Sequence, residues 1–411
     1  MGRRFVQFGL LVLLIAGIFV GSIAPATAFT DGQKLLSEVW RIVDRAYVDN
    51  TFNHQNWWFV RQSALRQPLA TSDETYAAIQ KMLASLDDPF TRLLKPDQYR
   101  SLQTNTAGEL TGVGLQIIQD KESSELRVIA PIEGSPADLA GIQPSDRITK
   151  IDGYPTALMT LDEAAQRMRG PVGSQVVLTI SREGSEATEI EVSRDRITLN
   201  PVYAELRSSE PNLPVGYIRL SQFNANATAE VAHAIAHLED QGATAYVLDL
   251  RNNPGGLLQA GIEIARLWLD EGVVVYTVNR HGIQDSFSAN GRALTQAPLV
   301  VLVNQGTASA SEILAGALQD NDRAKLVGER TFGKGLIQSL FSLSDGSGLA
   351  VTIAKYETPD HHDIHRQGIV PDVVVPLDGI SREQLVAEGD RQYQAAVDYL
   401  QATITLAKAE E

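Results

Sequence analysis

The chain has no cysteine among its 411 residues. This absence excludes disulfide bonds, zinc sites built on cysteine, iron–sulfur clusters and thiol catalysis, and it is compatible with either redox compartment. Basic residues are also scarce, because 35 Lys and Arg stand against 50 Asp and Glu and give a formal net charge of −15. Such an acidic surface repels phosphate backbones, so nucleic acid is not an expected partner. Internal repeats, low-complexity tracts and long linkers are absent from the sequence as well.

The composition is that of a globular protein, with 44% hydrophobic and 21% charged residues. At roughly 150 residues per domain, the length predicts two or three domains. We expect a leader (1–28), a helical N-terminal domain (29–105), a β-rich domain (106–197) and an α/β domain (198–380). The tail, 381–411, is expected to form a helix that joins the N-terminal helices.

The first residues have the pattern of an export signal. Arg3 and Arg4 precede a nearly unbroken apolar run over 5–23, and an Ala-Thr-Ala sequence ends at Ala28. This order is typical of a secretory signal that is cleaved after Ala28. The alternative is a retained anchor, because about 20 apolar residues can span a bilayer. Both interpretations predict an exported protein.

Hydrophobic periodicity separates the helical domain from the α/β domain. Apolar residues recur at helical spacing between 33 and 101, where glycine is rare. Between 201 and 376 the pattern alternates between strands and helices, and runs such as 300–303 (Val-Val-Leu-Val) are apolar throughout, as in strands covered on both faces. The predicted strands are 215–220, 246–250, 273–278 and 299–303, and the predicted helices are 228–240, 257–269 and 309–320.

Short β-like stretches separated by Gly, Pro and Asp fill the region 106–195, and a helix begins at Thr160, which can form a capping box with Glu163. The order of these elements resembles a PDZ domain. That resemblance implies capture of a peptide's free C-terminus, by a Gly-rich turn whose N–H groups hold the carboxylate and by strand addition beside an apolar pocket. By themselves, Gly112 and Gly114 fit an ordinary hairpin or β-bulge as well as they fit a carboxylate-binding turn. The residues predicted to bind the peptide are Gly112, Val113, Gly114, Leu115 and Ile117.

Two loops follow predicted strands of the α/β domain and lead into helices. They are 251–256 (Arg-Asn-Asn-Pro-Gly-Gly) and 304–309 (Asn-Gln-Gly-Thr-Ala-Ser), and if the two strands are neighbours, the loops meet at one edge of the sheet. Ligands in open α/β sheets bind beyond the carboxyl ends of strands, and helix starts present N–H groups at a positive dipole end. A serine here that faces a Gly-Gly turn could be a nucleophile beside an oxyanion site, or it could simply cap the helix.

A serine nucleophile needs a base, and Lys334 is the candidate. It lies between two glycines and is flanked by Phe332 and Leu336. Desolvation in an apolar setting disfavours the ammonium form, and a neutral amine can take a proton from a hydroxyl. The alternative is an ordinary solvated lysine in a loop.

The run 306–313 (Gly-Thr-Ala-Ser-Ala-Ser-Glu-Ile), followed by 331–335 (Thr-Phe-Gly-Lys-Gly) and Gln338, resembles the carboxyl-terminal processing peptidases, which are tail-specific serine proteases. With the PDZ-like region and the loop 251–256, the resemblance covers nearly the whole chain after the leader. It implies a ClpP/crotonase-like α/β core and neither a metal nor an organic cofactor.

The same resemblance assigns roles to single residues. It makes Ser309 the nucleophile, with Ser311 as a rival, and Lys334 the general base. It makes Gln338 the residue that orients the lysine, although in a regular strand residues four apart are separated by about 13 Å. The backbone amide of Ala310, with that of Gly255 or Gly256, would hold the oxyanion.

Two further segments, 40–49 and 86–92, resemble the branch of this family found in photosynthetic organisms. That branch implies one substrate near a membrane, the photosystem II reaction-centre subunit made with a short C-terminal extension, and a location in the thylakoid lumen or the periplasm. The alternatives are a broad tail-specific protease of extracytoplasmic quality control and a non-catalytic PDZ binding protein. No oligomeric state is predicted.

Histidines offer competing sites. His233 and His237 are four apart on a predicted helix, but Ala234 stands where the zinc-protease motif has Glu, and both point away from the apolar stripe. We therefore expect a solvated helix face and no metal site there. The cluster 361–365 (His-His-Asp-Ile-His) could bind a metal or supply the base of a Ser-His-Asp arrangement, although 306–309 departs from the usual Gly-x-Ser-x-Gly elbow.

Overall fold

The structure, a computed structural model, describes residues 29–120, 125–132, 134–182, 186–208, 213–376 and 389–410. The predicted leader lies outside these residues. The chain divides into two compact units, Met1–Pro96 with Gln338–Thr352, and Asp97–Ile337 with Ile353–Glu411. Within the described ranges, no helix has both the length and the apolar character that a transmembrane span requires.

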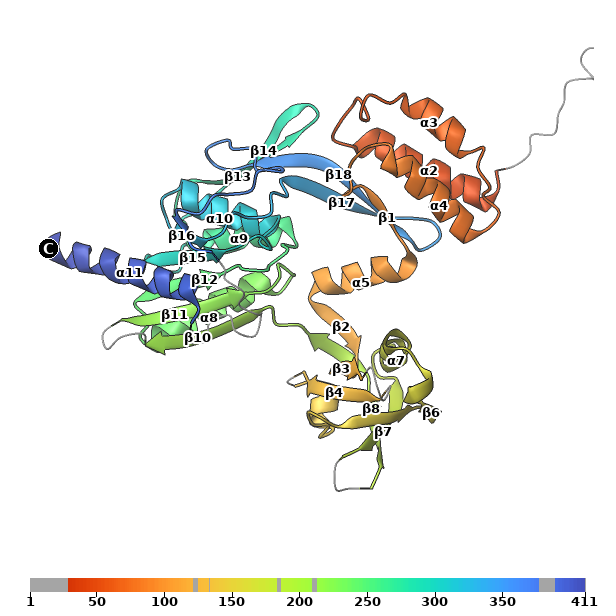
Figure 1. Cartoon of the computed structure of the whole chain (residues 1–411), viewed down its shortest axis with the longest axis horizontal. Coiled ribbons are helices and arrows are strands. Elements are labelled where there is room, and N and C mark those ends of the chain that lie inside the picture. Colours follow the sequence, from red (N-terminus) through yellow and green to blue (C-terminus); the bar gives the residue numbers. More distant parts are fainter. Residues whose placement is uncertain are drawn as a thin grey trace, which may run out of the picture. The chain divides into compact units, whose positions relative to one another are not determined.

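In the described part of the first unit, residues 29–96 form three helices and a strand, drawn in red and orange in Figure 1. Capping boxes at Thr30 and Thr71 begin α2 and α4. Val39 of α2 and Ile79 of α4 are completely buried. The unit also contains most of a long hairpin, β17–β18, whose second strand pairs with β1. The sequence did not predict this hairpin. The elements are α2 (Asp31–Ala46), α3 (Trp57–Ala64), α4 (Ser72–Ala84), β1 (Arg92–Leu94), β17 (Leu336–Ser342) and β18 (Gly348–Glu357).

A small β domain follows α5 (Pro96–Ala107) in the second unit, and strands β2 and β9 pair where the chain enters and leaves it. Its main sheet has the order β3-β4-β5-β7-β8 and encloses an apolar core. The predicted capping box is present, because Thr160 N–H donates to Glu163 Oε2 over 2.8 Å and Glu163 N–H donates to Thr160 Oγ1 over 3.3 Å. The elements are β2 (Glu109–Gly112), β3 (Leu115–Gln119), β4 (Leu126–Pro131), α6 (Pro136–Leu139), β5 (Arg147–Ile151), β6 (Tyr154–Pro155), α7 (Leu161–Met168), β7 (Gln175–Ser181), β8 (Thr188–Ser193) and β9 (Asp195–Thr198).

The α/β core is built on a six-stranded sheet of order β10-β11-β12-β15-β16-β19, parallel from β11 onward. Successive residues of β15 face opposite sides. Val301 and Val303 belong to the apolar cluster that includes α8, α9 and α10, whereas Val300 and Leu302 belong to the cluster that includes α11. This two-sided burial explains why the strand is apolar throughout. The elements are β10 (Val202–Ser208), β11 (Pro214–Leu220), α8 (Ala227–Asp240), β12 (Ala245–Asp249), α9 (Leu258–Arg266), β13 (Val273–Asn279), β14 (Gly282–Ser288), β15 (Leu299–Val303), α10 (Ala310–Asp320), β16 (Lys325–Gly328), β19 (Val373–Val374) and α11 (Arg391–Glu410).

The tail helix α11 corrects one prediction. We expected it to join the N-terminal helices, but Ala396 and Leu400 of α11 are buried against Val300 and Leu302 of the core sheet. Figure 1 shows α11 lying along β12 and β15. The physical reason is that this face of the sheet is as apolar as the other and requires a cover of its own.

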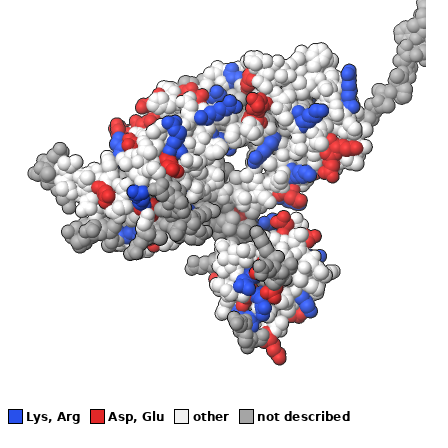
Figure 2. Space-filling model, viewed as in Figure 1, with Lys and Arg blue, Asp and Glu red and all other residues white. Residues whose placement is uncertain are grey.

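Surface charge is mixed on the face that Figure 2 shows, where Lys and Arg side chains are interspersed with Asp and Glu. Several of the exposed charges form ion pairs within one helix or turn, such as Lys34 with Asp31 and Lys325 with Asp322. Pairs of this kind contribute little to stability.

Candidate active site

The two loops that the sequence singled out meet at one edge of the core sheet, because β12 and β15 are adjacent and parallel. A reciprocal pair of hydrogen bonds joins them: Asn252 N–H donates to Asn304 Oδ1 over 2.9 Å, and Asn304 Nδ2 donates to Asn252 Oδ1 over 3.0 Å. The predicted juxtaposition of 251–256 with 304–309 is therefore present.

Ser309 stands at the N-cap of α10 with φ +59° and ψ −119°. A non-glycine residue in such a sparsely populated conformation costs about 1–3 kcal/mol and persists only where its surroundings hold it. Its side chain is half-buried, whereas Ser311 is fully buried and donates its hydroxyl to Asn253 O over 3.0 Å. Of the two candidate nucleophiles, only Ser309 is accessible.

The Gly255–Gly256 turn lies directly against Ser309. A Cβ atom added to Gly255 would lie 2.8 Å from Ser309 Cβ and 2.9 Å from Ala310 N, so only glycine permits this approach. Gly255 also has φ +92°, and its own N–H donates to Asn253 Oδ1 over 2.9 Å. The turn and the Ala310 amide thus lie together, at the place where the sequence predicts an oxyanion site.

Glu312 connects the serine to the lysine, a function that sequence reasoning missed. Its fully buried carboxylate accepts the N–H of Ser309 over 2.9 Å and the N–H of Lys334 over 2.8 Å. It also accepts the Gly333 N–H over 2.7 Å and the Thr331 hydroxyl over 2.6 Å. The available signal was the spacing of Glu312 three residues after Ser309, which is that of a helix cap.

Tyr356 makes a second connection between the same two residues. Its hydroxyl lies 3.0 Å from the carbonyl oxygen of Ser309 and 2.6 Å from that of Lys334. Its own N–H donates to Gly335 O over 3.1 Å. The loop that carries Lys334, itself half-buried, is thereby fastened to the start of α10.

Gln338 lies in β17, where its Nε2 is 3.5 Å from Thr352 Oγ1. It belongs to the first unit, whereas Ser309 and Lys334 belong to the second. The orienting role of Gln338 stays a prediction.

The histidines have other surroundings. His233 and His237 are exposed on α8, as predicted, and His237 Nε2 lies 3.0 Å from Gln241 Nε2. His361 stacks on Tyr276, with ring centroids 4.3 Å apart, and its Nδ1 lies 2.9 Å from Glu357. Among the described residues, no group of three or more His, Cys, Asp or Glu side chains is placed to hold a metal ion.

A small groove of about 90 Å³ opens in the β domain. Gly114 (φ +80°) allows its wall to close, because a Cβ there would lie 2.3 Å from Ser135 Cβ. The groove is mostly apolar, with one cation, Arg169, at its wall. Its lining comprises the five residues predicted to bind a peptide, Gly112, Val113, Gly114, Leu115 and Ile117, together with Leu110, Ala165, Met168 and Arg169.

Comparisons with known proteins identify the family. The profile of "Peptidase family S41" matches residues 214–375, and that of "PDZ domain" matches 127–182. The "Carboxyl-terminal-processing protease" of Synechocystis sp. (strain ATCC 27184 / PCC 6803 / Kazusa) is 60% identical over 406 residues, which cover 98% of this chain and 95% of that protein. The chain belongs to peptidase family S41.

Two further relatives agree with this assignment. "Carboxyl-terminal-processing peptidase 2, chloroplastic" of Arabidopsis thaliana is 48% identical over 384 residues, 89% of this chain and 74% of that protein. A solved structure named "Photosystem II D1 C-terminal processing protease" is 43% identical, with a TM-score of 0.56, and covers 86% of this chain and 95% of that one. The predicted family, the α/β protease core with a PDZ domain, and the serine peptidase activity are confirmed.

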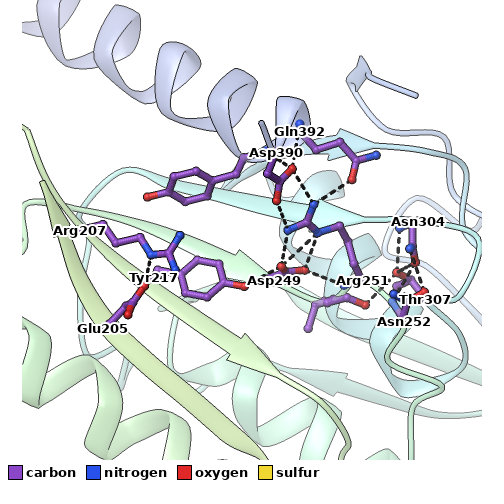
Figure 3. Close-up of polar contacts among 12 residues, drawn as sticks. Glu205, Arg207, Tyr217, Asp249, Arg251, Asn252, Asn304, Thr307, Asp390 and Gln392 are labelled. Carbon is purple, nitrogen blue, oxygen red and sulfur yellow. Dashed lines mark hydrogen bonds and ion pairs between the residues drawn. The ribbon is translucent and has the colours of Figure 1, made fainter. Parts of the chain in front are cut away.

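A buried ionic cluster lies beside the loops 251–256 and 304–309 of this S41 peptidase (Figure 3). Arg251 donates to Asp249 over 2.6 Å, to Asp390 over 2.8 Å and to the Gln392 side chain over 3.1 Å. The side chains of Asp249, Arg251 and Asp390 are at most 1% exposed. Burial lowers the pKa of Arg251, but the two carboxylates more than offset this and raise it overall, so the guanidinium stays charged. The start of α11 is thus fastened to the first residue of the loop 251–256.

Replacing Asp390 with alanine is expected to lower the free energy of unfolding of this peptidase by about 3–5 kcal/mol, because it removes one partner from a buried ion cluster. Urea denaturation measures the change. The matched control is Asp398→Ala on the exposed face of the same helix, where less than about 0.5 kcal/mol is expected. Equal effects at the two positions would contradict the structural role of the cluster.

Proposed function

We propose that this S41 peptidase removes C-terminal extensions from exported proteins, with Ser309 as nucleophile and Lys334 as general base. The observation that carries this assignment is that one carboxylate, that of Glu312, accepts hydrogen bonds from the backbone N–H groups of both residues. The strained conformation of Ser309 and the approach of Gly255 support it.

The proposed reaction proceeds through an acyl-enzyme. As Ser309 Oγ attacks the scissile carbonyl carbon, the neutral Lys334 amine takes the hydroxyl proton and later gives it to the leaving amine. The negative charge on the carbonyl oxygen is held by the Ala310 amide and by an amide of the Gly255–Gly256 turn. Water then attacks the ester with Lys334 again as base, the bond from the acyl carbon to Ser309 Oγ breaks, and the lysine returns the proton to Ser309 Oγ. Gln338 is the residue proposed to orient the lysine. Neither a metal nor an organic cofactor takes part.

The PDZ groove supplies the recognition of chain ends in this proposal. A substrate tail adds as a strand beside β3, and its terminal carboxylate is held by the N–H groups of the Gly112–Gly114 turn. The small, apolar groove accepts the last side chain of the tail. In this proposal the PDZ groove recognises the chain end, and Ser309 cleaves the chain at a different site.

The substrate we propose is the photosystem II reaction-centre subunit made with a C-terminal extension. Similarity to the photosystem II D1 C-terminal processing protease supports it, and the export signal predicted over 1–28 supports action in the thylakoid lumen or the periplasm.

The test compares matched peptides that carry such an extension, with a free or an amidated C-terminus, by mass spectrometry of the products. We expect one cut in the free-acid peptide and a kcat/KM at least about tenfold lower for the amide, because amidation removes the charge that the turn binds. Equal cleavage of the two peptides would overturn the carboxylate recognition. Equal cleavage of unrelated tails would instead indicate a broad tail-specific protease.

A further inference from the structure

Glu312 and Tyr356 both contact the backbones of Ser309 and Lys334, one at their N–H groups and the other at their carbonyl groups. The Glu312 carboxylate accepts the N–H groups of Ser309 and Lys334, and the single proton of the Tyr356 hydroxyl is shared between their carbonyl oxygens, at 3.0 Å and 2.6 Å. Each residue is therefore fixed at both its N–H and its C=O by the same two side chains. Neither side chain touches the reacting hydroxyl or amine in these contacts.

Backbone bonds hold the loop on both sides of Lys334, because Arg366 N–H donates to Gly333 O over 2.8 Å and Tyr356 N–H donates to Gly335 O over 3.1 Å. Between these bonds, the Tyr356 hydroxyl lies 2.6 Å from Lys334 O. The same hydroxyl links the carbonyl of Lys334 to the carbonyl of Ser309. Its loss would remove this link while the loop keeps its other bonds.

We propose that the Tyr356 hydroxyl is a positioning group that sets the distance between Ser309 and Lys334 by bridging their carbonyl groups. This inference rests on the proposed roles of the two residues. Burial, reinforced by the Glu312 carboxylate, raises the pKa of Tyr356 well above 10, so the phenol remains a donor throughout the neutral range. A misplacement of about 1 Å in a reacting pair lowers the rate by about 100-fold.

The test removes one oxygen atom by Tyr356→Phe, which keeps the buried ring. The matched control is Tyr246→Phe in β12, which also removes a buried hydroxyl, one whose partner is Ile235 O at 3.4 Å. Four quantities are measured for each variant: kcat and KM with a tailed peptide, the rate of Ser309 labelling by a fluorophosphonate, and the midpoint of thermal unfolding.

We expect Tyr356→Phe to lower kcat and the labelling rate by about 10- to 100-fold with KM within about twofold of the parent. The control should stay within about threefold in kcat. Both variants should remain folded at the assay temperature, which the unfolding midpoint shows. A kcat of Tyr356→Phe within threefold of the parent, or an equal loss in both variants, would overturn the proposal. Ser309→Ala distinguishes failure of this inference from failure of the proposed function, because cleavage that survives in Ser309→Ala overturns the proposed function.

Discussion

Replacing Ser309 with alanine is expected to abolish cleavage of tailed peptides, lowering kcat by about 10,000-fold or more. The variant lacks the oxygen that forms the acyl-enzyme, whereas the PDZ groove is built from other residues and keeps its shape. Peptide affinity, measured by fluorescence anisotropy, should therefore stay within about twofold of the parent. Cleavage is followed by mass spectrometry of the products.

The control for this prediction is Ser311→Ala, two residues further along the same helix. The Ser311 hydroxyl is buried and donates to Asn253 O. Removing it should lower the free energy of unfolding by about 1 kcal/mol and change kcat by less than about tenfold. Cleavage that survives in Ser309→Ala but disappears in Ser311→Ala would make Ser311, and not Ser309, the nucleophile.

Replacing Lys334 with arginine should lower kcat by about 1,000-fold or more. The substitution keeps the positive charge and nearly the length of the side chain, but a guanidinium does not lose its proton in proteins and cannot act as a base. KM should change far less, because the groove that binds the tail does not include Lys334. Steady-state kinetics with a tailed peptide measure both quantities.

Lys355→Arg is the matched control, since Lys355 is an exposed residue of β18 that pairs with Asp363 over 3.7 Å. This variant should retain its kcat within about twofold. If Lys334→Arg retains activity as well, the requirement for a neutral amine is contradicted, and the base must be sought in another side chain.

Local pattern was enough to predict much of this protein. Apolar runs predicted the buried strands, Ser309 at the start of a helix was predicted within one residue, and parallel strand order predicted that 251–256 and 304–309 meet. These features depend on neighbours in the sequence or on general rules for α/β sheets. The five residues predicted to bind a peptide all line the groove for the same reason, because they are consecutive or alternate along the chain.

The missed features depend on contacts between distant segments. Tyr356 lies 47 residues after Ser309, and nothing in the strand around it distinguishes its hydroxyl from that of other buried tyrosines. The tail was misplaced because an amphipathic helix shows that it has an apolar face but not which surface covers it. Glu312 could be recognised as a helix cap, but its bonds to the lysine loop required the fold.

The bond between Arg251 and Asp390 joins residues 139 positions apart, and the later one directly precedes α11. A polypeptide emerges from its N-terminus, so both Ser309 and Lys334 are made before the carboxylate that completes the buried cluster. Until α11 is synthesised and folded, the guanidinium of Arg251 has Asp249 as its counter-charge but lacks Asp390. The order of synthesis therefore makes this buried cluster one of the later parts of the core to close.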